Sequence, residues 1–326
     1  MFFSLIIPVY NRPDEIRVVL EGLSRQSYGN FEVIVVEDGS ENKSDQVVEL
    51  FKHDLDVLYY YIENVGQGFA RNYGFSKSRG EYIIILDSDI IVPEHYMQSV
   101  QEHLQQDELD CFGGPDKAHP DFTDIQKAAD FAMTSYLTTG GTRGRSEVVA
   151  SYYPRSFNMG MKREVYEKSG GFKLPDCGED LEFSIRIEKL GYRIGLIREA
   201  FIYHKRKSTI KSFFDQMVWF GKSRINVQRF FADSFKLIHL VPLFFYVYLL
   251  LTLTLMFLLP QLGTLMLSAL VVYFFLIFSE SLFRYRSFPV AFLSLITSAS
   301  VFLGYGWGLI RYHFQQKGPY IKGKTA

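Results

Sequence analysis

Two aspartates one residue apart, Asp87 and Asp89, follow an apolar run that is typical of a buried strand. At a strand end, both carboxylates can be presented together, and two neighbouring acids repel each other unless they share a cation. Hard oxygen ligands of this kind suit Mg²⁺ or Mn²⁺. An Asp-x-Asp triplet also occurs by chance in many chains. The spacing therefore makes a divalent-cation site the first hypothesis, with an ordinary strand-to-helix turn as the alternative.

Polar residues also follow the other apolar runs near the N-terminus. Asn11 follows the first run and Asp38 the second, and the third leads into the sequence Gly66-Gln67-Gly68. A lone Gly-x-Gly is weak evidence for a dinucleotide site, whose fingerprint belongs in the first strand–helix turn, and that turn has no glycine here. The sequence also lacks GxxxxGK[ST], GxSxG and HExxH, which excludes the P-loop, hydrolase-elbow and zincin motifs.

The elements that must hold these residues alternate between strand and helix patterns. Strand patterns cover 2–9, 31–36, 57–62 and 82–86, and helical patterns cover 14–26, 43–53 and 67–78. This alternation predicts an α/β fold with a mostly parallel sheet and crossover helices. In such sheets ligands bind beyond the carboxyl ends of the strands, which is where the polar residues above are expected to lie.

Length, charge and cysteine content limit the alternatives. With 326 residues, 48% of them hydrophobic, the chain can bury a large core, which excludes a disordered protein. Residues 1–204 carry a net charge of −12, residues 205–236 carry +6, and residues 237–326 carry +5. A broad basic face for nucleic acid is therefore not expected. Cys111 and Cys177 lie outside any metal-binding spacing, which predicts free thiols in a reducing compartment.

Five motifs in a fixed order resemble the family 2 inverting glycosyltransferases of GT-A fold. They are SLIIPVYNRP (4–13), VVEDGS (35–40), ENVGQGFARNYG (63–74), ILDSDI (85–90) and GEDLEFSIRI (178–187). The resemblance covers about residues 1–205 and is far more specific than any one motif. It implies a catalytic domain at 1–205 with a Rossmann-like sheet, a nucleotide-sugar half at about 1–112 and an acceptor half at about 113–205.

The same resemblance implies a nucleotide-sugar donor, with a UDP-sugar as the commonest choice in the family. Asp87 and Asp89 would hold Mn²⁺ or Mg²⁺, which bridges the donor diphosphate and stabilises the leaving group. His204 matches a third metal ligand that enzymes of this fold often take from the end of the catalytic domain, although an incidental histidine is the alternative. The implied nucleotide-sugar-binding positions are Pro8, Tyr10, Asp38, Arg71 and Asp87.

Asp180 is the implied catalytic residue. It opens a helical pattern at 181–190, and the amino end of a helix favours a carboxylate. The family uses this Asp as the general base that deprotonates the acceptor hydroxyl as it attacks C1 of the sugar, with inversion; a simple helix cap is the alternative. Gly114, Asn158 and Glu179 match acceptor-side positions.

A base at Asp180 has a consequence for the acceptor. A polyprenyl phosphate is already ionised and needs no base, so the base favours a hydroxyl on a glycan, expected to be lipid-linked. The alternatives are a polyprenyl-phosphate glycosyltransferase and a catalytically inactive membrane adaptor.

The C-terminal third is typical of a membrane anchor. The 43 residues 237–279 contain no Asp, Glu, Lys or Arg, and Pro260-Gln261-Leu262-Gly263 divides them into two segments of spanning length. Residues 287–310 add 24 uncharged residues, so two to three transmembrane segments are predicted at 237–310. A third crossing would place the basic tail, 311–326, outside, against the positive-inside rule. A re-entrant or interfacial last segment is the alternative.

Residues 206–236 are predicted to contain an amphipathic juxtamembrane helix. Apolar positions recur at helical spacing between basic residues, which suits the headgroup plane of a membrane with anionic lipid. Packing on the catalytic domain is the alternative. The basic excess places the catalytic domain in the cytosol. We therefore expect a multi-pass protein of the cell membrane.

Overall fold

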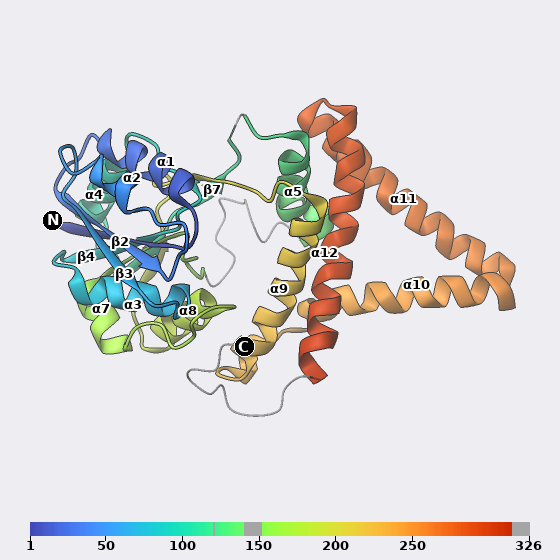
Figure 1. Ribbon diagram of the computed structural model, residues 1–326. Helices are drawn as coiled ribbons and strands as arrows, with labels where there is room; N and C mark the ends of the chain where they lie inside the picture. Colours follow the sequence, from blue (N-terminus) through green and yellow to red (C-terminus); the bar gives the residue numbers. More distant parts are fainter. Residues whose placement is uncertain (120, 140–151, 315–326) are drawn as a thin grey trace. The chain divides into compact units, whose positions relative to one another are not determined.

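The computed structural model of the chain describes residues 1–119, 121–139 and 152–314 (Figure 1). These residues divide into two compact units. The α/β unit comprises residues 1–119 and 152–205, and it contains all the predicted site residues. The helical unit comprises residues 121–139 and 206–314.

A seven-stranded sheet forms the centre of the α/β unit. Its strands are β1 Phe3–Val9, β2 Phe31–Asp38, β3 Val57–Ile62, β4 Tyr82–Leu86, β6 Cys111–Gly113, β8 Asn158–Lys162 and β9 Ile194–Leu196. Their order is β3-β2-β1-β4-β8-β6-β9. The pairs among β1 to β4 and the pair β6–β9 are parallel, whereas β8 is antiparallel to both of its neighbours. The predicted mostly parallel sheet is confirmed.

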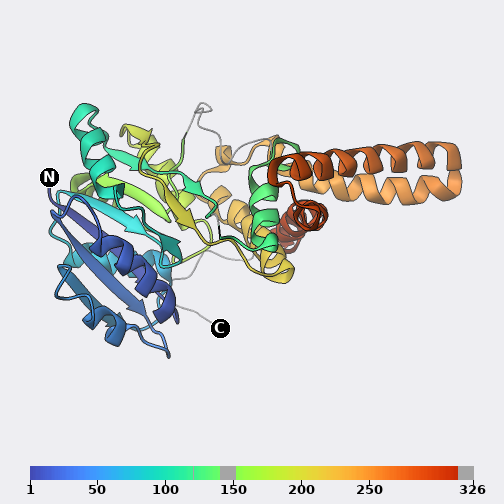
Figure 2. The same cartoon turned by 90° about the horizontal axis from the view of Figure 1, so that it is seen from above.

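Helices cover both faces of this sheet (Figures 1 and 2). One face packs against α1 Pro13–Ser24, α2 Asp45–Glu49 and α4 Tyr96–Gln106, and the other against α3 Gln67–Lys77, α7 Arg163–Ser169 and α8 Glu179–Lys189. Successive strand residues point to opposite faces, so Leu5 and Ile7 enter the first core and Ile6 enters the second. Because both faces are covered, the strands are nearly continuous apolar runs.

A second, three-stranded sheet brings distant parts of the α/β unit together. It consists of β5 Ile90–Ile91, β10 Ile202–His204 and β7 Asp116–Lys117. The central strand is β10, with β5 on one side and β7 on the other. β10 is antiparallel to β5, with His204 opposite Ile90. The last strand of the unit therefore returns to the segment that directly follows β4.

The helical unit contains α5 Asp124–Thr134, α6 Tyr136–Thr139, α9 Ile210–Gln228, α10 Val241–Leu258, α11 Pro260–Tyr285 and α12 Phe288–Phe314. Two 3₁₀ turns, Ala232–Ser234 and Leu237–Leu240, connect α9 to α10. Residues 121–139, which lie within the predicted acceptor half at about 113–205, belong to this unit. Ala129 and Ala132 of α5 pack with Met217 of α9 and Val301 of α12, because small side chains allow this helix to approach the apolar helices.

Three helices are long and apolar enough to cross a membrane: 237–258, 260–285 and 288–314. The break predicted at Pro260 is confirmed, since α10 ends at Leu258 and α11 begins at Pro260. The predicted amphipathic helix corresponds to α9, which packs along α12. Of the basic tail, residues 315–326 lie outside the described residues. Cys111 and Cys177 are buried free thiols, as predicted.

Candidate active site

Asp87, Asp89 and His204 form a cluster beyond the carboxyl end of β4. Each offers one ligand atom, and these atoms lie within 4.8 Å of one another. The two aspartates come from the turn between β4 and β5, while the pairing of β10 with β5 places His204 beside them. Two carboxylates provide the hard oxygen donors that Mg²⁺ and Mn²⁺ prefer, and histidine is a common metal ligand. The donor set therefore fits the predicted cation.

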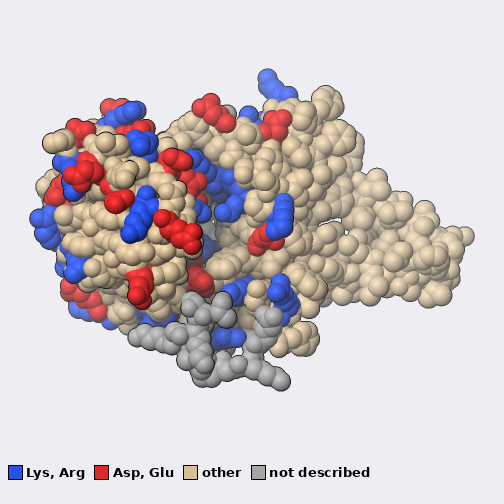
Figure 3. All heavy atoms as spheres, viewed as in Figure 1, with Lys and Arg blue, Asp and Glu red and all other residues tan. Residues whose placement is uncertain are grey.

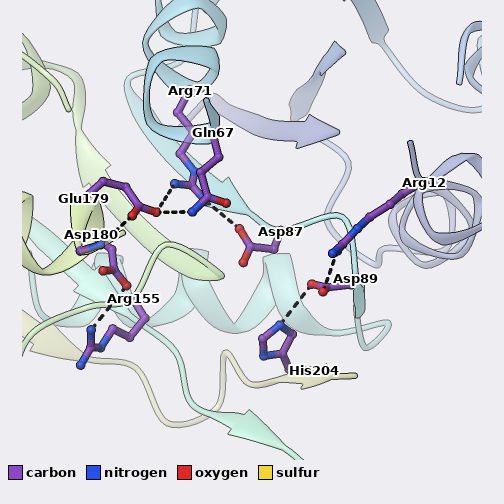
Figure 4. A network of polar contacts seen from close by, with 10 residues as sticks. Arg12, Gln67, Arg71, Asp87, Asp89, Arg155, Glu179, Asp180 and His204 are labelled. Carbon is purple, nitrogen blue, oxygen red and sulfur yellow. Dashed lines mark hydrogen bonds and ion pairs between the residues drawn. The ribbon is translucent and has the colours of Figure 1, made fainter. Parts of the chain in front are cut away.

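Two positively charged or hydrogen-bonding groups contact Asp89 (Figure 4). Nη1 of Arg12 lies 2.7 Å from Oδ2 of Asp89, and Nε2 of His204 lies 3.1 Å from its Oδ1. Burial alone would raise the pKa of Asp89, but His204 and Arg12 outweigh it and hold the pKa below its usual range. Phe157 stacks on the imidazole with the ring centroids 5.2 Å apart, which fixes the ring plane.

Arg71 connects the turn that carries Asp87 to the start of α8. Its side chain is fully buried; Nη2 lies 2.8 Å from Oδ1 of Asp87 and Nη1 lies 3.0 Å from Oε1 of Glu179. Gln67 donates a hydrogen bond of 2.6 Å to the same oxygen of Glu179. Both ends of the Arg71 guanidinium are thus paired with carboxylates of the protein. Arg71 is therefore a buried crosslink between Asp87 and Glu179.

The amino end of α3 reaches this position because two glycines precede and open the helix. Gly66 has a φ of +89°, which a residue with a side chain rarely adopts. A Cβ atom on Gly68 would lie 2.1 Å from the carbonyl oxygen of Leu174. The Gly68 N–H donates to the Pro175 carbonyl at 2.7 Å. The close approach of the two backbones sets Gln67 and Arg71 against Glu179.

Asp180 lies in the first turn of α8, after a turn in which Cys177 and Gly178 both have positive φ. Its Oδ1 accepts a hydrogen bond from the Leu181 N–H at 2.7 Å, and its Oδ2 lies 3.5 Å from Nη1 of Arg155. The side chain is 18% exposed, so its carboxylate remains accessible. An accessible carboxylate held in place by an N–H and a cation can accept a proton from an incoming hydroxyl.

Glu179 has a different environment from its neighbour. Its side chain is 4% exposed, and burial followed by the charge of Asp180 raises its pKa to about 7, although Arg71 opposes this. Its Oε2 also accepts from the Gly178 N–H at 3.1 Å. The two adjacent acids therefore differ: one is buried in the crosslink and the other faces outward.

Three of the predicted nucleotide-sugar-binding residues, Pro8, Tyr10 and Asp38, lie at the carboxyl ends of β1 and β2. Pro8 is buried within β1, opposite Val36, while Tyr10 is 52% exposed just beyond the strand end. Asp38 accepts hydrogen bonds from the N–H groups of Val65 and Gly66 at 2.7 and 3.0 Å. Burial raises the pKa of Asp38, against the effect of these two hydrogen bonds. Asp38 thus also shapes the loop that leads into α3.

Of the predicted acceptor residues, Asn158 and Gly114 lie next to each other in the interior. Asn158 is fully buried; its amide donates to the Ala200 carbonyl at 2.8 Å and accepts from the Tyr96 hydroxyl at 2.7 Å. A Cβ on Gly114 would lie 1.8 Å from the same carbonyl. These contacts favour a positioning role for both residues.

No role for Arg12, Gln67 or Arg155 follows from the sequence alone. All three lie in or beside motifs that were recognised: Arg12 in the first motif, Gln67 in the third and Arg155 three residues before Asn158. The sequence shows that these side chains can donate hydrogen bonds, but each one pairs with a carboxylate that is 25 to 112 residues away along the chain. No local pattern encodes such pairings.

Comparison with known proteins identifies the family. A family model described as "Glycosyl transferase family 2" matches residues 4–170, about half of the chain. An uncharacterised glycosyltransferase of Rickettsia bellii is 43% identical over 86 residues, which cover 26% of this chain and 12% of the relative. The glycosyltransferase GlyA of Streptococcus pneumoniae is 32% identical over 203 residues, which cover 60% and 26%. The chain thus spans about a quarter or less of the length of these two relatives.

A solved structure supports the fold. The mannosyltransferase PcManGT from Pyrobaculum calidifontis, solved with GDP-Man and Mn²⁺, has a TM-score of 0.58 and 17% sequence identity. The match covers 97% of this chain and 88% of that one. At this identity the likeness shows the fold alone, and it confirms the predicted GT-A architecture. With a family model that matches half of its length and this fold, the chain belongs to glycosyl transferase family 2.

Proposed function

We propose that this protein is a membrane-anchored, inverting glycosyltransferase that moves a sugar from a nucleotide-sugar donor to a hydroxyl of a lipid-linked glycan. The observation that carries the proposal is one connected network at one end of the sheet. It runs from the cation-ligand cluster through Asp87 and Arg71 to Glu179, the neighbour of Asp180 (Figure 4). A donor held at one end of this network and an acceptor near the other would meet between them.

In the proposed reaction, Asp180 accepts the proton of the acceptor hydroxyl while that oxygen forms a bond to C1 of the sugar. The bond from C1 to the donor diphosphate breaks on the opposite face, which inverts the anomeric carbon. A cation held by Asp87, Asp89 and His204 would neutralise the charge that develops on the diphosphate. UDP-sugars are the first donors to test. The α/β unit would act in the cytosol, at the face of a membrane that contains anionic lipid.

Nucleotide binding tests the donor half of the proposal. We expect UDP or GDP to bind the detergent-solubilised protein in a titration calorimeter only when Mn²⁺ or Mg²⁺ is present, and we expect Asp89→Ala to lose this binding. Asp54→Ala, in an exposed turn, is the control and should bind normally. Failure of both nucleotides to bind with any metal would contradict a UDP- or GDP-sugar donor and would favour another donor nucleotide or the catalytically inactive adaptor.

Asp180→Asn tests the acceptor half. Because the amide cannot accept the proton, we expect sugar transfer to fall by about 10²- to 10⁴-fold while metal-dependent nucleotide binding is retained. Asp54→Asn is the matched control. Full transfer by Asp180→Asn would contradict the hydroxyl acceptor and would favour the alternative, a polyprenyl phosphate, whose ionised oxygen needs no base.

A further inference from the structure

The hairpin formed by α10 and α11 exposes apolar side chains on all sides. Phe244, Leu250, Phe257, Leu265 and Phe275 are each 63–80% exposed. Its surface is uncharged in the view of Figure 3, as the absence of charged residues from 237–279 requires. The 18 residues of α10 and the 26 of α11 measure about 27 and 39 Å, against a hydrocarbon core of about 30 Å. Such a hairpin needs lipid all around it.

The backbone polar groups at the turn of the hairpin form hydrogen bonds within the protein and therefore need little water. A single residue, Leu259, separates the two helices, and it donates its N–H to the Leu255 carbonyl at 2.8 Å. Its own carbonyl accepts from Leu262 and Gly263, both at 3.0 Å. Pro260 has no N–H to satisfy. Backbone groups that are paired internally can enter hydrocarbon, so the tip can lead the hairpin into a bilayer.

Charged groups gather at the opposite end of the hairpin. Glu280 accepts a hydrogen bond of 2.8 Å from Ser135, and Arg284 lies 3.4 Å from Asp130 and donates to Thr134 at 2.8 Å. These contacts bind the end of α11 to α5 and its following residue. Because ionised groups are costly within hydrocarbon, this end marks the boundary with the headgroups.

The third apolar helix, α12, is packed quite differently. About half of it is buried, and α9 lies along it with almost no gap: Cβ atoms on Gly304 and Gly308 would lie 2.7 Å from Met217 Cβ and 2.2 Å from the Val218 carbonyl oxygen. Earlier in the helix, Thr297 donates to the Ala128 carbonyl of α5 at 2.9 Å. Because of these contacts, α9 and α5 must lie at the same depth in the membrane as the middle of α12.

Those two partners are charged. Within α9 lie Lys211, Asp215, Lys222 and Arg224, and within α5 lie Asp124, Lys127 and Asp130. If α12 crossed the membrane, its middle would lie at the centre of the bilayer, and these groups would be drawn into hydrocarbon. Their cost there argues against a crossing by α12.

The orientation and the exposed surface of α12 also argue against a crossing of the membrane by this helix. In Figure 1 it runs across the base of the hairpin, and in Figure 2 it is seen nearly end-on while α10 and α11 are seen from the side. Its exposed large side chains, Phe288, Phe292, Ile296, Trp307 and Phe314, recur at steps that keep them on one face of a helix. A helix with one exposed apolar face suits the surface of a bilayer.

We propose that the hairpin α10–α11 inserts into the bilayer, while α12 lies in its interface with the exposed apolar face toward the hydrocarbon and α9 above it. Both ends of α12 are then on the side of the membrane that holds α9. Only residues 205–209 connect α9 to the α/β unit, so that unit and Arg311 are on the same side too. This arrangement removes the conflict with the positive-inside rule. It rests on the membrane location proposed above, but not on the glycosyl transfer.

Cysteine labelling of the full chain in sealed membrane vesicles tests the arrangement. The native cysteines are buried, so the unmodified chain serves as the background control. Ser287→Cys and His313→Cys report the two ends of α12, Gln261→Cys reports the tip, and Ser76→Cys, exposed on α3, marks the side of the α/β unit. A membrane-impermeant maleimide is added to right-side-out and to inverted vesicles.

We expect Ser287→Cys and His313→Cys to be labelled from the same side as Ser76→Cys, and Gln261→Cys not to be labelled from that side until detergent is added. Labelling of His313→Cys from the side opposite Ser287→Cys would mean that α12 crosses the membrane and would overturn the proposal. So would labelling of the tip from the Ser76 side. Tyr312→Cys repeats the decisive test if His313→Cys fails to fold. Release of the chain by alkaline carbonate would instead contradict the membrane location itself.

Discussion

At Asp89, both carboxylate oxygens already have partners within the protein. Arg12 contacts Oδ2 and His204 contacts Oδ1, so a cation that binds at this residue must displace or share one of them. Arg12 is the easier to displace, because its side chain is 38% exposed and long, whereas the ring of His204 is stacked on Phe157. We infer that Arg12 competes with the cation for Asp89.

Arg12→Gln tests this competition. A partly exposed ion pair contributes about 0.2–1 kcal/mol, so the variant should bind Mn²⁺ up to about fivefold more tightly. The spectrum of free Mn²⁺ in an electron paramagnetic resonance titration measures the affinity. Arg17→Gln, in α1, which begins directly after Arg12, should behave as the unmodified protein. A weaker Mn²⁺ affinity in Arg12→Gln would contradict the competition.

Glu179 makes the stability of the fold depend on pH. In the unfolded chain the pKa of a glutamate is about 4.5, whereas in the folded chain burial and the charge of Asp180 raise the pKa of Glu179 to about 7. Between these values unfolding releases a proton, so the free energy of unfolding falls as the pH rises. We expect Glu179→Gln, which cannot ionise, to lose this part of the pH dependence.

Thermal unfolding of the solubilised protein at several values between pH 5 and pH 8 measures the effect. The melting temperature of the unmodified protein should fall by a few degrees more than that of Glu179→Gln, since about 1 kcal/mol shifts it by roughly 2–4 °C. Glu188→Gln, at an exposed position of the same helix, should keep the full dependence. Equal slopes in all three proteins would show that Glu179 is ionised throughout.

At the scale of elements, glycines determine how closely the helices of the helical unit pack. A Cβ on Gly221 of α9 would lie 2.3 Å from the Tyr305 carbonyl oxygen, and Gly304 and Gly308 face α9 from the other helix. Small residues on both helices let the backbones come into direct contact. The contact gains dispersion energy along its whole length and needs no polar side chain.

Gly308→Val should separate the two helices. The added atoms overlap the Val218 carbonyl, and overpacking of this kind costs about 1–3 kcal/mol, so we expect a lower melting temperature in detergent. Ala299→Val, on the half-exposed side of the same helix, is the matched control and should melt as the unmodified protein does. An unchanged melting temperature in Gly308→Val would mean that the two helices are not in close contact in detergent.

The elements of the sheet could be predicted from the sequence because each strand is a short, continuous apolar run. The predicted 57–62 and 82–86 agree with β3 and β4 to the residue. The place of α5 could not be predicted, because its alanines fit a soluble core as well as a membrane-side helix. The crosslink by Arg71 was also missed, since it joins Asp87 to Glu179 across 92 residues of chain.

At the scale of the whole molecule, the described residues of each unit form hydrophobic clusters and ion pairs of their own. In the helical unit Asp130 is buried and pairs with Arg206 at 3.0 Å and Arg284 at 3.4 Å, and it accepts a hydrogen bond from Tyr285 at 3.0 Å. The carboxylate of Asp130 thus connects α5 to Arg206, which precedes α9, and to the end of α11. None of these groups is among the residues described above for the candidate active site.

Asp130→Asn should therefore destabilise the protein without changing its ligand affinity. Removing one partner of a buried ion pair leaves the arginines uncompensated and costs about 3 kcal/mol. We expect a lower melting temperature in detergent, but the same dissociation constant for the metal–nucleotide pair at a temperature below the transition. Asp124→Asn, exposed on the same helix, is the control. A parallel loss of nucleotide affinity would show that the two units depend on each other.

The pairing of β10 with β5 also fixes when, during synthesis, the active site can be completed. Asp87 and Asp89 leave the ribosome early, but their partner His204 is the last residue of β10 and lies next to the end of the α/β unit at Lys205. A nascent chain that ends before it has both acids but lacks the third ligand. The cation site proposed above can thus be complete only once translation has passed β10, after nearly the whole α/β unit has been made and before the long apolar helices.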